Sequence, residues 1–320
     1  MEREPGLSAG AGPEAVPGAL AGAVAVLVAA NVLNNRLAPR LAPLTSAAAT
    51  GALVVMARRS GLSWAELGFH RRSRGLRIGG ALASAVAGAY AVGIAVPATR
   101  GFFHDERALS LSRARALEEA LLQVPVGTVL LEEVGFRGVL HALVARSHGR
   151  GTATAVSSVL FGLWHILPSL DMMAANPALS RLAAGEALDV PAARDSGVEG
   201  AGSERPTGPD APGVPAAPGV PAVPGVPAVP GVPGRAPAWR VVRVVAGSVV
   251  TTGLAGVLFT ELRRRGGLAA PAMFHVATNS LGYLFARLAP PNLANPNRPD
   301  RPTRPAPPEG PAPGRRPPPK

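Results

Sequence analysis

Two acids and an arginine lie together inside an apolar stretch and are the residues of this chain best suited to chemistry. Glu132, Glu133 and Arg137 occur in the run from Leu131 to Arg137. An ionisable side chain in a bilayer costs about 3 kcal/mol on insertion scales, so such residues are functional hypotheses by default. Three of them within one short run predict a functional site at membrane depth.

The two acids are expected to differ in role. Glu133 and Arg137 are four residues apart with the acid N-terminal, which is the favourable arrangement for a helical ion pair. Pairing lowers the burial penalty of both charges. Glu132 lies about 100° further around a helix and lacks that partner. Glu132 is therefore the predicted proton-transferring carboxylate.

Two further apolar stretches each contribute polar side chains. His165 follows Phe161 by four residues near the end of one stretch. His275 and Asn279 in the last stretch are also four apart, hence on one helical face. Buried polar groups are least costly when they point into one shared cavity, so the pattern predicts a hydrophilic active site between three helices.

In this order on successive hydrophobic helices, the patterns Glu-Glu-x-x-x-Arg, Phe-x-x-x-His and His-x-x-x-Asn resemble the motifs of the CPBP family of CAAX proteases and bacteriocin-processing (Abi domain) proteins. The family includes the type 2 CAAX prenyl endopeptidases. The resemblance covers roughly residues 115 to 171 and 241 to 287. It implies an intramembrane endopeptidase in which Glu132 and His165 activate water. The resemblance further implies that His275 and Asn279 stabilise the oxyanion, and that Glu133 and Arg137 support the site.

Two mechanisms stay open at this stage. One is free of metal and uses the glutamate and histidine pair as a general base. The other makes Glu132, His165 and His275 ligands of Zn²⁺, as the label metalloprotease, often given to the family, implies. The sequence has no His-Glu-x-x-His pattern and asparagine is a poor zinc ligand. No cofactor is assigned, and zinc remains the one candidate.

The same residues also fit two other function classes. A non-catalytic immunity or scaffold protein of the membrane would retain the pocket for binding, and a proton-coupled transporter would use intramembrane Glu and His as a relay. Intact motifs count against the first, and the absence of paired inverted repeats counts against the second. The expected substrate is a membrane-associated peptide or protein, since the motifs specify chemistry and leave its identity and the oligomeric state open.

Composition supports a membrane protein. The 320 residues are 47% hydrophobic and 16% charged, and the apolar residues form long blocks. There is no cysteine, which excludes disulfides and thiolate nucleophiles. The net charge of +12 comes from arginines clustered at the ends of apolar stretches, without an aromatic-interleaved basic face, so no nucleic-acid partner is expected.

The elements that position these motifs are predicted as an all-α, polytopic transmembrane bundle. A hydrocarbon core needs roughly 20 apolar residues per helix. Scanning for such stretches predicts about seven spans, in the range six to eight: 15–33, 41–57, 78–99, 116–145, 151–170, 241–261 and 267–286. We therefore expect a multi-pass protein of the cell membrane, in a bacterial plasma membrane, with the lipid bilayer as its first partner.

The loop between the second and third predicted spans is the most basic, which marks it as cytoplasmic. Trp64, Leu67 and Phe69 of that loop predict an amphipathic segment at the membrane interface. The alternation places the N-terminus inside and the arginine-containing C-terminal tail outside, against the charge rule. His70, His104, His141 and His148 lie outside the motifs and are predicted to be structural.

Four regions follow from these observations. Residues 1–110 are predicted as N-terminal membrane helices with the basic loop, and 111–171 with 239–288 as the catalytic core. Residues 172–238 hold Val-Pro-Gly repeats, in which frequent proline removes backbone donors and prevents helix, and are predicted as a disordered insert. The Pro- and Arg-rich residues 289–320 are predicted as a disordered tail.

Overall fold

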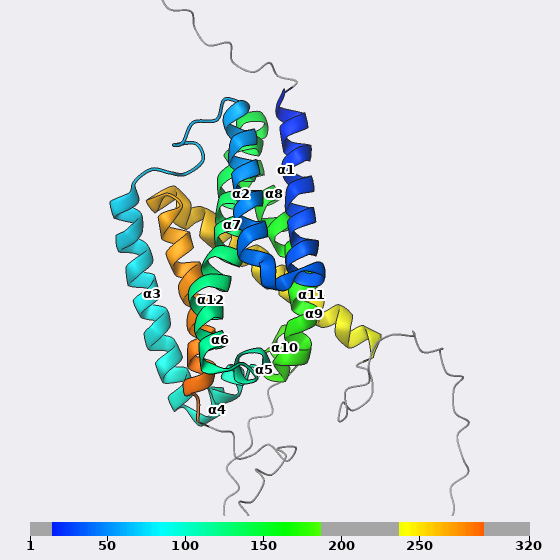
Figure 1. Ribbon diagram of the computed structural model, residues 1–320, viewed down its shortest axis with the longest axis vertical. Helices are drawn as coiled ribbons and strands as arrows, with labels where there is room; N and C mark the ends of the chain where they lie inside the picture. The colour runs from blue at the N-terminus through cyan, green and yellow to red at the C-terminus, as the bar shows by residue number, and fades with distance from the viewer. Residues whose placement is uncertain (1–14, 187–236, 291–320) are drawn as a thin grey trace, which may run out of the picture. The chain divides into compact units, whose positions relative to one another are not determined.

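The computed structural model describes residues 15–186 and 237–290, and within these ranges it contains helices and turns but no strand (Figure 1). The long helices are α1 (Ala15–Val32), α2 (Ala42–Arg59), α3 (Arg72–Ala95), α8 (His141–Trp164), α11 (Ala238–Gly266) and α12 (Ala269–Leu288). The shorter ones are η1 (Leu33–Leu37), η2 (Pro39–Leu41), α4 (Pro97–Arg100), η3 (Gly101–Phe103), α5 (Glu106–Leu109), α6 (Arg113–Glu118), η4 (Glu119–Val129), α7 (Leu130–Glu132), η5 (Glu133–Leu140), α9 (Ile166–Ala175) and α10 (Pro177–Ala183). The predicted all-α bundle is confirmed.

One helical run from Arg113 to Trp164 joins α6, η4, α7, η5 and α8. It is interrupted at Gly149, whose φ of 81° lies in the left-handed region that glycine adopts readily. The interruption separates the fourth and fifth predicted spans. The fifth ends at Trp164 and not at residue 170, because Pro168 has no N–H to offer the Trp164 carbonyl and the chain bends by 42° into α9.

Four helices of the described ranges are long and apolar enough to cross a membrane: Pro17–Leu37, Pro39–Arg59, Arg72–Ala95 and Ala238–Gly266. The bent pair Arg113–Trp164 and Ile166–Ala175 makes a fifth if it is one span. Helix α12 is not among them, because His275, Asn279 and Arg287 lower its apolar content. All seven predicted segments contain helix, but the number of seven membrane crossings is not confirmed and stays a prediction.

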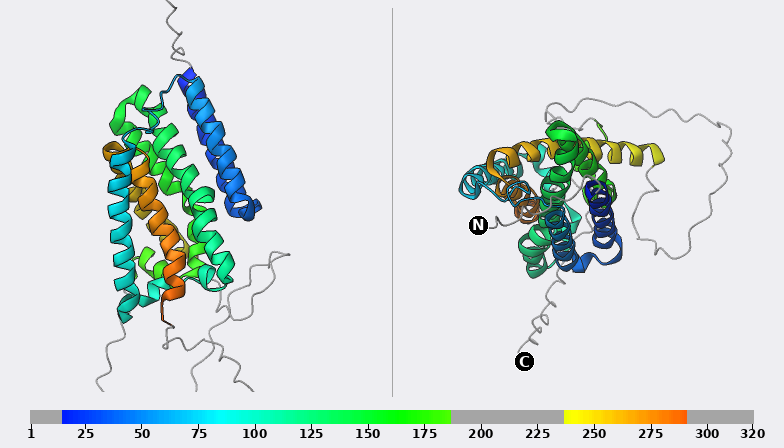
Figure 2. Two further views of the ribbon diagram at one scale, coloured as in Figure 1. Left: turned by 60° about the vertical axis from the view of Figure 1, so that its left-hand side comes forward. Right: turned by 90° about the horizontal axis from the view of Figure 1, so that it is seen from above.

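Helix η5 lies at the centre of the bundle, in contact with α1, α2, α8 and α11. Around it, α11 packs along α8, and α3 packs along α12 (Figure 2). Gly162 permits the first of these contacts, since a Cβ there would lie 2.5 Å from the backbone oxygen of Val249. The close approach brings the end of α8 against α11, and η5 is enclosed on several sides.

Charge and apolar surface are distributed as expected for a protein in lipid. All residues from Leu131 to Val144 are buried, including two acids and an arginine. Apolar side chains such as Leu121, Val242 and Leu254 are instead about two-thirds exposed on the outside of their helices. A water-soluble protein would place charges outward and leucine inward. The reversed arrangement supports a bundle that faces lipid.

The basic loop between α2 and α3 is only partly the interfacial segment that the sequence predicts. Trp64 and Phe69 are half exposed and contact each other edge to face, with ring centroids 5.4 Å apart. Leu67 is fully buried in the core and acts as an internal anchor of the loop. Glu66 joins the loop to α8 through an ion pair with Arg146 at 2.7 Å.

Protonation of Glu66 should release this loop. Partial burial acts to raise the pKa of Glu66, but hydrogen bonds from Ser63 and from Arg146 outweigh it and lower the pKa from 4.5 to about 2. The anchoring is therefore expected to be complete above pH 4.5 and to be lost as the pH falls from 4.5 towards 2. Hydrogen exchange of residues 61–71 in detergent, corrected for intrinsic rates, measures this. Glu66→Gln should exchange rapidly at every pH, and equal protection of both proteins at about pH 6 would contradict the prediction.

The predicted insert begins later than residue 172. Helix α9 continues to Ala175 and α10 follows at Pro177–Ala183. Asn176 makes this possible because its side chain accepts the backbone N–H of Leu179, which caps α10, and proline is well suited to the first helical position. The low-complexity part of the insert, and the tail beyond residue 290, lie outside the described residues.

Candidate active site

The first motif lies at the buried centre of the bundle. Glu132 ends α7, and Glu133 and Arg137 belong to η5, a π-helical segment. Their exposed fractions are 3%, 2% and 0%. Single π-helical turns inside α-helices occur often at functional sites. The three predicted residues are therefore all buried in the bundle, on or next to a π-helical segment. Because water does not reach them, each charge must be balanced by a neighbouring group.

Glu133 connects two of the three motifs. Its Oε1 lies 3.6 Å from Nη1 of Arg137, which confirms the predicted ion pair across one helical turn. The same oxygen lies 2.8 Å from Nδ1 of His275 on α12. An ionised carboxylate only accepts, so Nδ1 carries the proton of this hydrogen bond. Glu133 thereby orients His275 and leaves its Nε2 directed elsewhere.

Glu132 faces the same imidazole from the other side. Its Oε2 lies 3.6 Å from Nε2 of His275, and among the described residues this oxygen has no hydrogen-bond partner. Its Oε1 accepts a hydrogen bond of 2.8 Å from the indole Nε1 of Trp164 at the end of α8. One carboxylate oxygen is thus held by the protein and the other is left for a reacting group.

Aromatic rings enclose the arginine. The guanidinium carbon of Arg137 lies 3.6 Å from the ring centroid of Phe161 and 4.8 Å from that of Phe259. Within the described residues its nitrogens make no hydrogen bond, so the ion pair with Glu133 and these cation–π contacts balance its burial. The ring of Phe161 also stands edge-on to His165 and to His275, with centroids 4.6 Å and 6.2 Å apart.

His165 is half-buried at the bend between α8 and α9. Its Nδ1 lies 2.8 Å from the carbonyl oxygen of Phe161, which can only accept, so Nδ1 carries the proton. That tautomer leaves Nε2 as a proton acceptor. No hydrogen bond joins His165 to Glu132 in the described part of the chain, and His165 reaches the cluster through its edge-on contact with the ring of Phe161.

Asn279 lies one turn after His275 on α12, as predicted, and is half-buried. Its Oδ1 accepts a long hydrogen bond, 3.4 Å, from the hydroxyl of Thr278. In the regions the structure covers, no contact joins its amide to Glu132 or His165. The structure therefore brings the two acids, the arginine and His275 into direct contact, places His165 beside them, and leaves Asn279 at the edge of the cluster.

The predicted zinc ligands do not gather around one point. Within residues 15–186 and 237–290, no group of three His, Asp or Glu side chains has an arrangement that could hold a metal ion. Nδ1 of His275 bonds Glu133 and Nδ1 of His165 bonds a backbone carbonyl, which leaves Nε2 of each ring as the nitrogen available to other partners. As arranged here, Glu132, His165 and His275 lack the convergence that a resident zinc ion requires.

Sequence reasoning missed two residues of the cluster. Trp164 precedes His165 directly, and Phe259 lies on α11, a helix without a motif. An aromatic residue next to a motif histidine was the only signal for the first, and no pattern marked the second. His141, four residues after Arg137, is buried and its Nδ1 has no partner among the described residues, where no side-chain hydrogen bond or ion pair joins it to the cluster.

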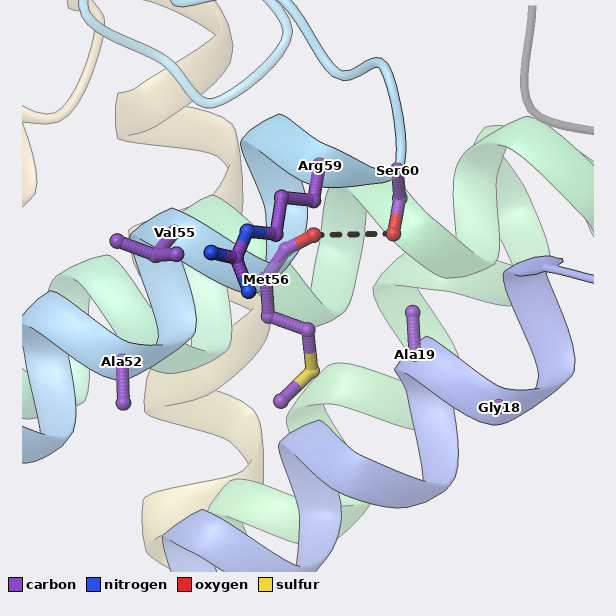
Figure 3. Close-up of a pocket in the computed structure, with 7 residues that line it drawn as sticks. All are labelled: Gly18, Ala19, Ala52, Val55, Met56, Arg59 and Ser60. Carbon is purple, nitrogen blue, oxygen red and sulfur yellow. Dashed lines mark hydrogen bonds between the residues drawn. The ribbon is translucent and has the colours of Figure 1, made fainter.

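A surface pocket between α1 and α2 lies apart from this cluster (Figure 3). It is lined by Gly18, Ala19, Ala52, Val55, Met56, Arg59 and Ser60. None of these belongs to a motif, and the lining contains no acid or histidine that could act as a general base. The chemistry predicted from the sequence belongs to the buried cluster and not to this pocket.

Comparison with known proteins finds a family match over the part of the chain that holds the motifs. Residues 119–281 match the model of one protein family, described as type II CAAX prenyl endopeptidase Rce1-like, and all three motifs lie inside the match. Searches of curated proteins and of solved structures find no match for the chain. The family match covers more than half of the chain and confirms the resemblance seen in the motifs. This multi-pass membrane protein therefore belongs to the type II CAAX prenyl endopeptidase Rce1-like family of membrane endopeptidases.

Proposed function

We propose that the chain hydrolyses a peptide bond of a membrane-associated peptide or protein, using water activated by Glu132 and His165 without a metal. The observation that carries the proposal is the asymmetric environment of Glu132. One oxygen accepts the indole N–H of Trp164, while the other is buried, unpartnered among the described residues and directed at His275. A fixed carboxylate with one free oxygen has the geometry of a general base.

Glu132, assisted by Nε2 of His165, takes a proton from water as the water oxygen bonds to the scissile carbonyl carbon. The resulting oxyanion accepts hydrogen bonds from Nε2–H of His275 and from the amide of Asn279. The proton is then passed to the departing nitrogen as the C–N bond breaks, which yields an amine and a carboxylic acid that afterwards releases its proton.

Charge neutrality of the buried cluster favours a protonated Nε2 on His275. Two ionised acids and one guanidinium carry a net charge of −1, and one additional proton makes the buried cluster neutral. A neutral cluster costs less in lipid than a charged one. When that proton is on His275, both ring nitrogens donate, one to Glu133 and one towards the reacting carbonyl. Glu133 and Arg137 support the site by holding this imidazole.

Cleavage by purified protein in liposomes tests the proposal. The substrates are quenched-fluorescent membrane peptides, including a prenylated CAAX peptide, and Glu132→Ala serves as the inactive reference. Because the cluster does not fit a metal, we expect cleavage to persist in the presence of a chelator and to disappear in the variant. Loss of cleavage with chelator and its return with zinc would contradict the metal-free mechanism. Proton-coupled uptake by the same liposomes without cleavage would favour a transporter.

A further inference from the structure

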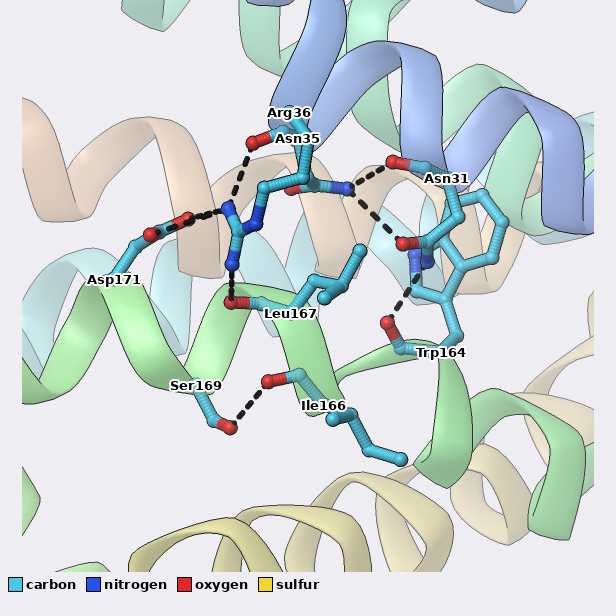
Figure 4. A network of polar contacts seen from close by, with 8 residues as sticks. All are labelled: Asn31, Asn35, Arg36, Trp164, Ile166, Leu167, Ser169 and Asp171. Carbon is cyan, nitrogen blue, oxygen red and sulfur yellow. Dashed lines mark hydrogen bonds and ion pairs between the residues drawn. The ribbon is translucent and has the colours of Figure 1, made fainter. Parts of the chain in front are cut away.

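The backbone carbonyl of Trp164 is bound by a side chain of helix α1. In an α-helix the Trp164 carbonyl would accept the backbone N–H four residues later, but that residue is Pro168, which has none. The side-chain amide of Asn31 on α1 supplies the missing donor, with Nδ2 2.9 Å from the Trp164 oxygen (Figure 4). Asn31 is 8% exposed, so without this bond the carbonyl would lack a partner in a region poor in water.

Asn31 is itself held in place. The side-chain nitrogen of Asn35 donates to the Asn31 carbonyl at 2.9 Å and lies 3.4 Å from its Oδ1 (Figure 4). Beyond it, Arg36 donates to the Leu167 carbonyl at 3.1 Å and pairs with Asp171 at 3.1 Å. Asn31 of α1 thus binds the α8 side of the bend, and Arg36 of η1 binds the α9 side.

The bend determines where two functional side chains point. Trp164 is the last residue of α8 and His165 follows it directly, with φ and ψ of −85° and 4°. A shift of the Trp164 backbone would move the indole away from Glu132 and displace His165 at the same time. The contacts form a chain from α1 to the acid: amide of Asn31, carbonyl and indole of Trp164, carboxylate of Glu132.

We infer that Asn31 and Trp164 are positioning residues that hold one oxygen of Glu132 and leave its other oxygen to activate water. The inference rests on the proposed hydrolytic function and extends it to a helix that lies outside the family match. The indole N–H stabilises the ionised carboxylate, because a charged acceptor strengthens the hydrogen bond. The other charged or titratable groups near Glu132 are His275, His165, Glu133 and Arg137.

The kinetic test compares variants that differ in one hydrogen bond. Trp164→Phe keeps an aromatic ring and loses the donor, and Asn31→Leu keeps the size and loses the amide. Both should lower kcat by about 10-fold or more with KM nearly unchanged, and Trp164→Phe should move the acidic limb of the pH–rate profile up by about one to two pH units. Trp239→Phe, the same substitution at an indole outside the cluster, is the matched control that leaves the limb in place. An unchanged limb in Trp164→Phe would overturn the inference.

A suppressor tests the assignment of Asn31 to the Trp164 carbonyl. Pro168→Ala restores a backbone N–H four residues after Trp164, so it should relieve most of the loss caused by Asn31→Leu. Arg36→Met should show no such relief, because Arg36 binds α9 beyond the bend. If Asn31→Leu causes the same loss with and without the additional Pro168→Ala substitution, the assignment is contradicted.

A spectroscopic test does not need activity. In a Trp64→Phe/Trp239→Phe background, Trp164 is the single tryptophan, and ultraviolet resonance Raman reports the hydrogen bond of its indole N–H. The bond signal should weaken on Glu132→Gln and on Asn31→Leu, and an unchanged signal overturns the contact itself. If the signal responds but the wild-type protein cleaves no peptide, the proposed function fails and the catalytic purpose of the contact fails with it.

Discussion

Glu132→Gln is expected to lower kcat for peptide cleavage by about 10²–10⁴-fold, the range in which a general base contributes. Glutamine preserves the size of the side chain and can still accept the Trp164 indole with its amide oxygen, but it cannot take a proton from water. Steady-state cleavage of a fluorescent peptide by protein in liposomes measures the effect. The folded bundle should persist, since removing a buried charge relieves a desolvation cost.

A matched carboxylate on the same helical run provides the control. Glu119 is half-buried and ion-paired with Arg115 at 3.4 Å, away from the motif cluster. Glu119→Gln is expected to retain cleavage within about twofold, because exposed or half-exposed pairs contribute little. If Glu132→Gln keeps more than a tenth of the wild-type rate while its thermal unfolding is unchanged, Glu132 is not the base.

Arg137→Met should cause the largest loss of stability of any single substitution in the cluster. It leaves Glu133 ionised and buried without its cation, and breaking one partner of a buried pair costs about 3–5 kcal/mol. Titration with denaturing detergent, followed by circular dichroism, measures the free energy of unfolding. The loss should be independent of substrate and should appear in protein that also carries Glu132→Gln.

The double variant Glu133→Gln/Arg137→Met separates loss of the pair from loss of one partner. Removing both charges is often nearly neutral for stability, so the double variant should regain most of the stability lost in Arg137→Met. Arg115→Met at the half-exposed pair should cost about 0–1 kcal/mol. A cost below about 1 kcal/mol for Arg137→Met would falsify the view that this ion pair holds the centre of the bundle.

Local relationships were predictable because they need only helical spacing. The pairing of Glu133 with Arg137 follows from their separation of four residues and is found in the structure at 3.6 Å. The helical segments followed from apolar stretches, with ends that differ where a proline intervenes, as at Pro168. The helix α10 inside the stretch predicted as an insert was not predictable from composition, since its capping by Asn176 depends on one side chain and one backbone group.

The contacts between side chains of different helices could not be predicted from residue spacing. The π-helical segment η5 places Glu133 and Arg137 at angles that differ from the roughly 100° step of an α-helix. His275 was expected at the oxyanion or as a zinc ligand, and no pattern predicted that its Nδ1 binds Glu133, 142 residues away in sequence. No pattern in one segment specifies how far a distant helix is rotated towards it.

By itself the sequence determined which residues are candidates for chemistry, that they lie on helices and to which family the chain belongs. Each of these depends on residue type and short spacing, which the one-dimensional order contains. Only the tertiary structure decided that Glu132 is held by Trp164, that Glu133 orients His275, and that Asn31 completes the end of α8. These partners meet because burial leaves each polar group without water, and the donor that satisfies it comes from whichever helix packs alongside.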